Sequence, residues 1–336
     1  MNKSNQYPTI SVVIPCFNSE KRLPLCLDSI KMQTYPQEKL EIIIVDDDSA
    51  DKTVVIAQEY GCLVLRNGTH NIERGKSIGV VASSGDYIFL IDDDNRLTNE
   101  NWLMDLTTAV IEESCVGGQS SKFHFDKNDT LPNRYAALFG VSDPTVYYLN
   151  KRDKLMATEH SWSLPGKVIK EADKYYVVEF DKDSLLTIGS QGFLVKKEYL
   201  LRGTYEPYLY HMDVNMELVM QGLNTYVMLK DSVIHDHSKG VAHSIGKLKR
   251  NIALFYSESQ YRIYKYDIKK ATMLKLGIIM STIIIPLIDS IRGYVKFRDP
   301  AWFLHPVLSF RVALMYGVIT LKNYFIKRQN RGKETL

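Results

Sequence analysis

The stretch Gly85–Asn95, reading GDYIFLIDDDN, constrains the fold of this chain more than any other. Its apolar run, YIFLI, is rich in aromatic and β-branched residues and predicts a strand buried on both faces. The run ends abruptly in three adjacent carboxylates, Asp92, Asp93 and Asp94. Such carboxylates repel one another, so they need water, hydrogen-bond donors or a cation around them. A solvated acidic turn is the simplest alternative.

The acidic end of this strand predicts a binding site. In an open parallel sheet, ligands bind just beyond the carboxyl ends of the strands. Carboxylate oxygens at that edge suit a hard cation, Mg²⁺ or Mn²⁺.

Apolar runs and helical segments alternate along the first third of the chain. This alternation predicts right-handed βαβ units and an α/β fold with a mostly parallel central sheet and helices on both faces. A strand pair flanking Gly189–Gly192 is also expected. The predicted strands are 10–14, 40–45, 62–65, 87–91, 185–188 and 193–195, and the predicted helices are 18–34, 53–60, 75–83, 102–113 and 213–221.

The composition is sufficient for a hydrophobic core and gives no sign of paired cysteines. The chain has 336 residues, 45% of them hydrophobic, and its four cysteines form no CxxC pair. We expect these cysteines to be buried, reduced thiols in a cytosolic compartment. The N-terminal sequence MNKSNQYPT lacks the apolar core of a signal peptide, so we expect no secretion signal.

Several spaced motifs, taken together, resemble the family 2 glycosyltransferases with the GT-A fold. The resemblance covers roughly residues 8–260, and the chain departs from the family pattern at Asp48, Ser77 and Met212, where glycine, asparagine and glutamate are usual. The matching segments are Ser11–Asn18 (opening strand), Val45–Thr53 (second-strand motif), Arg74–Gly79 with Gly85–Tyr87 (segment before the DxD motif), Asp92–Asp94 (the DxD motif), Gly189–Leu200 (acceptor-side loop), His211–Asp213 (the Glu-Asp pair) and His235–His237 (closing histidine).

This resemblance implies an inverting, metal-dependent transfer of a sugar from a nucleotide-diphosphate sugar to an acceptor hydroxyl. It implies a nucleotide-sugar-binding half over residues 1–120 and an acceptor-binding, catalytic half over residues 121–260. Residues 261–336 would form a basic, apolar helical tail that associates with a membrane.

The resemblance also assigns a cation site. A divalent cation on Asp94, helped by Asp92, would stabilise the negative charge that grows on the departing diphosphate. His235 or His237 could complete the metal shell or touch the diphosphate. A strand histidine can equally have a structural role.

The donor site extends to the ends of the first two strands. Asp47 could accept a hydrogen bond from the nucleotide base, although Asp also caps helices well. Arg74 and Lys76 are candidates for binding the diphosphate or the base. Alternatively, they are ordinary solvated charges on a helix. The expected donor-binding residues are Pro15, Phe17, Asp47, Arg74, Lys76, Asp92 and Asp93.

Asp213 is the predicted general base. It opens a helix, whose dipole favours the ionised carboxylate, and in-line attack needs such a group on the face opposite the leaving group. An ordinary N-cap is the structural alternative. Gln191 and Gly192 are expected to contact the sugar or the acceptor.

The C-terminal segment is basic and apolar. From Lys265 onward it holds 13 of the 42 Lys/Arg but only 4 of the 39 Asp/Glu. Two apolar stretches, 276–288 and 300–321, are too short or too interrupted for clean spans of about 20 residues. The segment that connects them carries three positive charges, and two spans would place these charges outside the cell, against the positive-inside tendency. We therefore favour an in-plane or re-entrant hairpin on the cytoplasmic face of the cell membrane over two spans. A hairpin packed on the catalytic domain or on a dimer partner is the soluble alternative.

Three functions remain open from the sequence. The favoured one is transfer to a lipid-linked or cell-surface glycan, as in polysaccharide and cell-envelope biosynthesis; transfer to polyprenyl phosphate is a close variant, in which Asp213 matters less. A catalytically inactive, membrane-bound sugar-binding scaffold is the second. A receiver-like phosphorylation switch is the third, but it leaves the sequence after about residue 120 without a role. We expect no nucleic-acid partner, and the sequence leaves homo-oligomerisation open.

Overall fold

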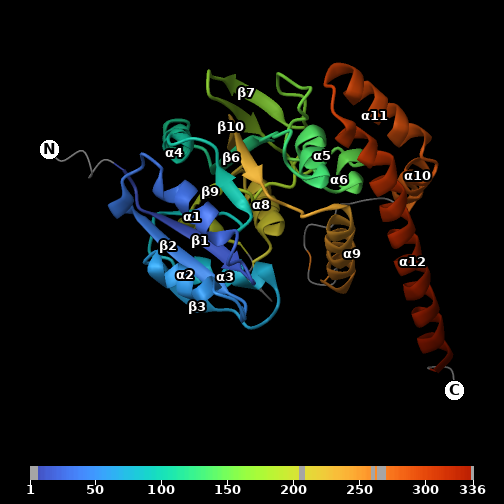
Figure 1. Ribbon diagram of the computed structural model, residues 1–336, viewed down its shortest axis with the longest axis horizontal. Helices are drawn as coiled ribbons and strands as arrows, with labels where there is room; N and C mark the ends of the chain where they lie inside the picture. Colours follow the sequence, from blue (N-terminus) through green and yellow to red (C-terminus); the bar gives the residue numbers. More distant parts are fainter. Residues whose placement is uncertain (1–6, 204–208, 259–261, 263–269, 334–336) are drawn as a thin grey trace. The chain divides into compact units, whose positions relative to one another are not determined.

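The computed structural model describes residues 7–203, 209–258, 262 and 270–333 (Figure 1). It divides into two compact units. The first contains residues 1–124, 151–155 and 159–236, and the second contains residues 125–150, 156–158 and 237–336.

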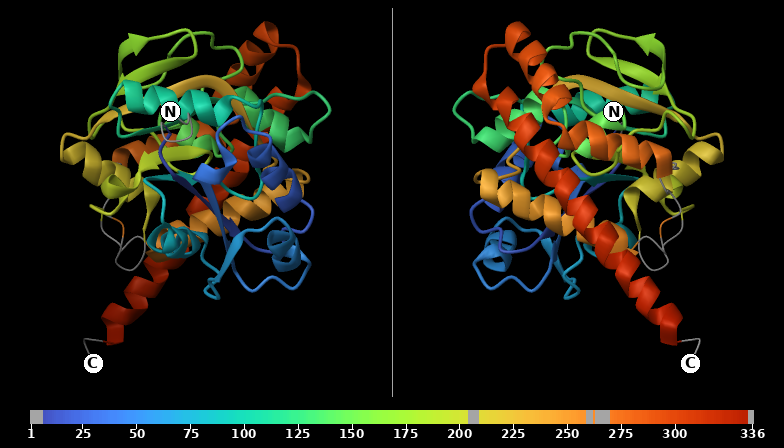
Figure 2. Two further views of the ribbon diagram at one scale, coloured as in Figure 1. Left: turned by 90° about the vertical axis from the view of Figure 1, so that its left-hand side faces the viewer. Right: turned by 90° about the vertical axis from the view of Figure 1, so that its right-hand side faces the viewer.

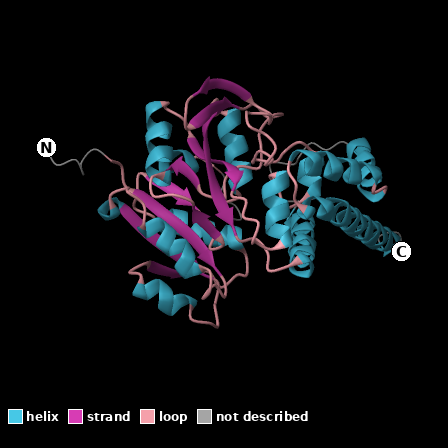
Figure 3. Cartoon of the chain, turned by 45° about the horizontal axis from the view of Figure 1, so that its top comes forward, coloured by secondary structure: helices cyan, strands magenta, loops and turns pink. Residues whose placement is uncertain are grey.

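The first unit is built on one ten-stranded sheet, which Figure 3 shows with helices packed against it. The strand order is β3-β2-β1-β4-β9-β6-β10-β8-β7, and β5 pairs with β10 outside this path. The strands are β1 Ile10–Cys16, β2 Leu40–Asp46, β3 Leu63–Arg66, β4 Tyr87–Leu90, β5 Asn95–Leu97, β6 Gly117–Phe123, β7 Lys167–Glu171, β8 Tyr175–Glu179, β9 Phe193–Lys196 and β10 Thr225–His235.

Strands β3, β2, β1 and β4 are parallel, as expected from the alternation of strands and helices. Strand β10 runs parallel to β6, whereas β9 inserts antiparallel between β4 and β6. The predicted α/β fold with a central sheet is therefore confirmed. Parallel register brings the carboxyl ends of β1, β2 and β4 to one edge, directly before Asp92.

Helices cover both faces of the parallel strands. On β1, Val12 and Ile14 pack in the core that includes α1, while Val13 faces α3, where it lies against Gly79. This alternation follows from the period of two in a strand. The helices of this unit are α1 Leu23–Lys31, η2 Gln37–Lys39, α2 Thr53–Glu59, α3 Ile72–Ala82, α4 Trp102–Glu112, α7 Lys197–Leu200 and α8 His211–Met220.

One local prediction is wrong. Residues 185–188 form no strand and instead lead through a loop into Gly189–Gly192 before β9 begins. Residues 121–179, whose irregular sequence predicts a partly helical insertion beside the site, are helical in part. They contribute the end of β6, the β7–β8 hairpin of the same sheet, and two helices of the second unit. The three-part division at residues 120 and 260 stays a prediction about function.

The second unit is helical and has its own apolar core. Tyr135, Phe139, Trp302 and His305 lie at its centre, with the Phe139 and His305 rings stacked 4.1 Å apart. In both views of Figure 2, α10 and α11 lie beside the long helix α12. Its helices are α5 Leu131–Phe139, α6 Pro144–Tyr148, α9 Val241–Glu258, α10 Lys270–Ser281, α11 Ile284–Lys296, η3 Pro300–Phe303 and α12 Leu304–Lys333.

The apolar stretch 276–288 is not one helix. Ile283 has a φ of 64°, and the helices on either side of it, 271–281 and 284–296, are bent by 67°. Within the described residues, Pro300–Ile319 is the one single helix that is long and apolar enough to cross a membrane, and 39% of it is buried against the protein. The bent pair meets the same test only as a broken span.

Candidate active site

The acidic turn lies between β4 and β5, at the edge where the sequence predicts it. Antiparallel pairing of β5 with β10 places His235 opposite Asn95. As a result, Nε2 of His235 lies 3.7 Å from Oδ1 of Asp94, and the amide of Asp236 donates to the Asp94 carbonyl at 2.7 Å. The structure therefore brings together two of the predicted metal ligands.

The ring of His235 packs against the ring of Phe123. The ring of Phe123, at the end of β6, lies with its centroid 5.2 Å from that of His235. The ammonium of the buried Lys154 lies 5.5 Å from the other ring of this pair, that of Phe123. The adjacent Asp153 binds this ammonium and also accepts a hydrogen bond from Nε2 of Gln119, so the polar groups behind Phe123 are paired with one another.

Asp93 points toward the start of α1. Its Oδ2 accepts hydrogen bonds from the Ser19 hydroxyl and from Nη2 of Arg22, the latter at 2.8 Å. Burial and the neighbouring Asp94 charge raise the pKa of Asp93 to about 6, against the opposing effect of Arg22. The structure thus gives this predicted donor-binding residue two protein partners that the sequence did not reveal.

Asp92 begins a chain of buried ionic contacts that crosses the site. Nζ of Lys76 lies 3.3 Å from Oδ1 of Asp92 and 3.4 Å from Oε1 of Glu73, and Nδ1 of His211 lies 2.9 Å from Oε2 of Glu73. Burial favours the neutral acid, but His211 and Lys76 outweigh it and hold the pKa of Glu73 below its usual value. Lys76, predicted as a possible solvated helix charge, is only 1% exposed.

The predicted base is at the far end of this chain of contacts. Asp213 is buried in the first turn of α8, two residues after His211. Asn215 fixes the same turn, because its side chain donates to the carbonyls of His211 and Ile188 and accepts from the Tyr226 hydroxyl. The contacts that start at Asp92 therefore end at His211, in the same helical turn as Asp213.

The loop Gly189–Gly192 contacts α8 at one end and β4 at the other. Gly189 has a φ of 130° and no room for a side chain, because a Cβ would meet the His211 ring at 2.8 Å. Gly192 has a φ of 74°, and its amide donates to the Leu90 carbonyl at the end of β4. Oε1 of Gln191 is buried and has no hydrogen-bond partner among the described residues, as expected for a group that awaits a ligand.

At the nucleotide end of the predicted site, two backbone amides hold the carboxylate of Asp47. Oδ1 of Asp47 accepts the backbone amides of Thr69 and His70, at 3.0 and 2.9 Å. The exposed rings of Phe17 and His70 lie edge to face beside it, 5.9 Å apart. The sequence gives no local signal for His70, because a single histidine in a loop forms no pattern with its neighbours.

The remaining predicted donor residues lie around α3. Pro15 is buried at the end of β1, where Gly75 allows the backbone of α3 to approach it. Arg74 is exposed on the same helix. Asn71 caps the helix by accepting the amides of Glu73 and Arg74. This cap places Glu73 and Lys76, three residues apart, on one face of the helix.

His237 belongs to the second unit. It is buried there, and its carbonyl accepts a hydrogen bond from Nζ of Lys247 at 2.8 Å. Its predicted role as a metal ligand stays a prediction.

The acidic turn fits a divalent cation in its chemistry. Burial, together with the charge of Asp94, raises the pKa of Asp92 even though Lys76 opposes this. An added cation would stabilise these crowded carboxylates in their ionised form. Among the residues that the structure describes, no three His, Cys, Asp or Glu side chains are grouped closely enough to hold a metal ion by themselves. Ligand oxygens from a diphosphate would have to complete the shell.

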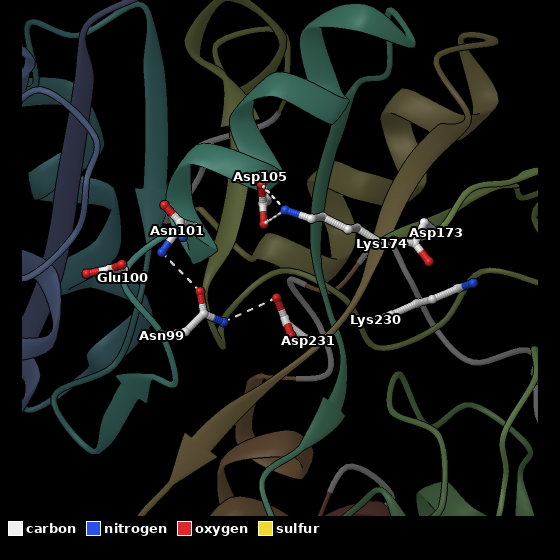
Figure 4. A pocket seen from close by; sticks show the side chains of 8 residues that line it. All are labelled: Asn99, Glu100, Asn101, Asp105, Asp173, Lys174, Lys230 and Asp231. Carbon is white, nitrogen blue, oxygen red and sulfur yellow. Dashed lines mark hydrogen bonds and ion pairs between the residues drawn. The ribbon is translucent and has the colours of Figure 1, made fainter.

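A separate cavity of about 440 Å³ opens in the same unit (Figure 4). Asp105 and Lys174 form an ion pair of 2.7 Å across it, and Asp231 accepts from the amide of Asn99. Asp231 lies four residues before His235 on β10, roughly 13 Å along the strand from the acidic turn. The cavity is therefore not part of the candidate site. Its other lining residues are Glu100, Asn101, Asp173 and Lys230.

Comparison with known proteins agrees with this reading of the first unit. Residues 11–162 match the family model described as Glycosyl transferase family 2. The chain is 26% identical over 205 residues to glycosyltransferase GlyA of Streptococcus pneumoniae, covering 57% of this chain and 28% of that protein. It is 38% identical over 116 residues to 4,4'-diaponeurosporenoate glycosyltransferase of Staphylococcus haemolyticus, covering 32% and 30%. The chain thus spans less than half the length of these curated relatives.

One solved structure has the same fold over most of the chain. It is described as the mannosyltransferase PcManGT from Pyrobaculum calidifontis in complex with GDP-Man and Mn²⁺. The TM-score is 0.56 at 13% identity, covering 93% of this chain and 87% of that one. At this identity the likeness establishes the fold alone, and it confirms the GT-A architecture expected from the sequence.

Proposed function

Because this chain belongs to the family 2 glycosyltransferases, we propose that it moves a sugar from a nucleotide-diphosphate sugar to an acceptor hydroxyl with inversion of configuration. The observation that carries the proposal is the continuous set of contacts from Asp92 through Lys76 and Glu73 to His211, at the start of the helix that bears Asp213. Single displacement needs a leaving-group site and a base near one another, and this set of contacts runs from the acidic turn to the helix that bears Asp213.

Each part of the site has a distinct role in the proposed reaction. Asp94 and His235, helped by Asp92 and by oxygens of the diphosphate, would hold Mn²⁺ or Mg²⁺, which when bound supplies positive charge for the departing diphosphate. Lys76 supplies a fixed positive charge beside the same carboxylates. Asp213 would accept the proton from the acceptor hydroxyl as that oxygen attacks the anomeric carbon. The exposed rings of Phe17 and His70 would lie against the nucleotide base, with Asp47 behind them.

Gly192 and Gln191 would receive the donor sugar or the acceptor. The left-handed backbone at Gly192 brings the loop against the end of β4, and the Gln191 carbonyl oxygen needs a hydrogen-bond donor. A sugar hydroxyl is such a donor.

The acceptor would be a lipid-linked or cell-surface glycan on the cytoplasmic face of the membrane. Support comes from α11, which exposes Ile284, Ile288, Ile291 and Val295 along one side. This spacing of four, three and four residues forms a single apolar stripe. Lys296 and Arg298 follow it, as expected of a helix that lies in the plane of an anionic membrane surface.

A direct test measures donor turnover and donor binding separately. The wild type, incubated with Mn²⁺ and a panel that includes UDP-glucose and GDP-mannose, should release nucleotide diphosphate from at least one donor. Asp94→Ala should lose both donor binding and turnover, whereas Asp213→Asn should bind the donor as the wild type does and lose transfer by at least about 100-fold. A wild type that binds a donor without turning it over would support the sugar-binding scaffold instead. Transfer to polyprenyl phosphate that survives Asp213→Asn would identify the phosphate acceptor, because a phosphate needs no base.

A further inference from the structure

Two residues outside the predicted site, Glu73 and His211, form a partly buried contact between two helices of the first unit. Oε2 of Glu73 lies 2.9 Å from Nδ1 of His211, and the two side chains are only 18% and 15% exposed. Glu73 lies in the first turn of α3 and His211 is the first residue of α8. The chain between them is 138 residues long, so this contact is made only in the folded protein.

A second contact joins the same two segments. The hydroxyl of Ser77, one turn further along α3, accepts the backbone amide of Leu209 at 2.9 Å. Leu209 is fully buried and lies two residues before α8 begins. The α3 helix therefore holds the approach to α8 at two points.

His211 also touches the acceptor-side loop. A Cβ on Gly189 would lie 2.8 Å from Cδ2 of the His211 ring, so the loop packs directly on that ring. The His211 ring therefore lies at the beginning of α8 and also in contact with the loop Gly189–Gly192.

Glu73 is shared between the two functional ends of the site. Its other oxygen, Oε1, lies 3.4 Å from Nζ of Lys76, which in turn lies 3.3 Å from Asp92. The Glu73 carboxylate is held between an ammonium and an imidazole with little water around it. Movement of the carboxylate away from either group would leave a charge without its partner, so one geometry is favoured.

We propose that Glu73 and His211 act as a positioning pair, which fixes the first turn of α8 so that Asp213 faces the donor site. The inference rests on the proposed function, since it assigns the pair a role in placing the base. Neither residue touches the reacting atoms. Loss of the pair should therefore change the turnover number far more than donor affinity, because a misplacement of about 1 Å can reduce rate by about 100-fold.

The kinetic test uses two disruptive variants and two conservative ones. Glu73→Ala and His211→Ala should each lower kcat for UDP-glucose or GDP-mannose turnover by about 10- to 100-fold, with KM for the donor changed by less than about threefold. Glu73→Gln keeps an acceptor oxygen and His211→Asn keeps a donor at the place of Nδ1, so both should retain most of kcat. The double alanine variant should be no slower than the slower single variant, because both substitutions break one contact.

The control is an ion pair of similar length that lies away from the site. Asp105→Ala breaks the pair with Lys174 in the separate cavity and should leave kcat unchanged. Equal losses in this control and in Glu73→Ala would overturn the proposal. Full activity in both alanine variants, or strictly multiplicative effects in the double variant, would do the same.

A second measurement needs no substrate and separates the two proposals. Hydrogen–deuterium exchange at the start of α8 should rise at least about tenfold in Glu73→Ala and stay at the wild-type rate in Asp105→Ala. Unchanged exchange would reject the positioning pair even in an active enzyme. Faster exchange in a chain that turns over no nucleotide sugar would keep the pair and reject the proposed reaction.

Discussion

Nζ of Lys76 lies 3.3 Å from Oδ1 of Asp92, with the lysine almost completely enclosed by protein. A buried ammonium in this position compensates one of three crowded carboxylates before any cation arrives. A permanent positive charge thus lies next to the predicted metal site, and it opposes the rise that burial causes in the pKa of Asp92.

Replacing Lys76 with Met removes this charge while keeping most of the side-chain volume. Asp92 and Glu73 would then be buried without their shared cation, and breaking such a pair costs about 3–5 kcal/mol of unfolding free energy. Mn²⁺ should restore more stability to Lys76→Met than to the wild type. Urea unfolding with and without Mn²⁺ measures both effects. Lys174→Met, which breaks an exposed pair, should cost at most about 1 kcal/mol; an equal loss in both variants would contradict the prediction.

The stability of the metal-free protein should depend on pH through Asp93. Burial and the Asp94 charge raise its pKa from the usual 3.8 to about 6, so the folded state binds more protons than the unfolded state between these values. The free energy of unfolding contributed by this group therefore falls as pH rises from about 4 to about 6. Mn²⁺ favours the ionised carboxylates, so its effect on Tm should be larger at pH 7.5 than at pH 5. Differential scanning fluorimetry at both pH values checks this.

Asp93→Asn serves as the control for that pH dependence, because the amide does not titrate. The slope of stability against pH between about 4 and 6 should flatten in this variant. An unchanged slope would assign the effect to other groups.

Gly79 on α3 is a position where the free energy of unfolding should depend on packing alone. A Cβ there would collide with Cγ1 of Val13 on β1, so Gly79→Ala should lower the free energy of unfolding by about 1–3 kcal/mol. Gly246 in α9 has no atom within 4 Å of an added Cβ, and Gly246→Ala should stabilise its helix by up to about 1 kcal/mol. Chemical denaturation of the two variants gives the comparison, and equal signs would refute it.

The apolar stripe on α11 predicts membrane binding that can be removed without loss of the active site. The double substitution Ile288→Asp and Ile291→Asp should lower binding to vesicles that contain anionic lipid by at least about tenfold, because each isoleucine contributes about 1.5–3 kcal/mol on burial. Co-sedimentation measures the bound fraction, and donor turnover should stay at the wild-type level. Val55→Asp on α2 exposes a charge at an equally accessible apolar position and should bind vesicles normally. Retained binding by the double variant would reject α11 as the contact surface.

The sequence was sufficient for the features that depend on periodicity and strand order. The acidic turn follows from the abrupt end of an apolar run, and its position at the sheet edge follows from the parallel order of β1, β2 and β4. The proximity of Asp94 and His235 is also predictable, but only from the family resemblance, because nothing local links two residues so far apart.

Contacts between distant helices could not be predicted in the same way. Glu73 and Lys76 share a helix face, a spacing visible in the sequence, yet their partners Asp92 and His211 are fixed by how α3 packs on the sheet. A buried lysine and a solvated one have the same local sequence. The strand expected at 185–188 failed for a related reason, because its apolar side chains are buried although these residues belong to no strand.

The insertion of β9 between β4 and β6 has a consequence for synthesis. As the chain leaves the ribosome, β1 to β4 can pair early, but the neighbour that closes the open side of β4 is made more than a hundred residues later. Until then a fully apolar edge, Tyr87–Leu90, has unpaired amides and carbonyls available to any other nascent strand. Fragments that end between residues 163 and 192 should therefore aggregate, even though they contain the whole family 2 match at residues 11–162.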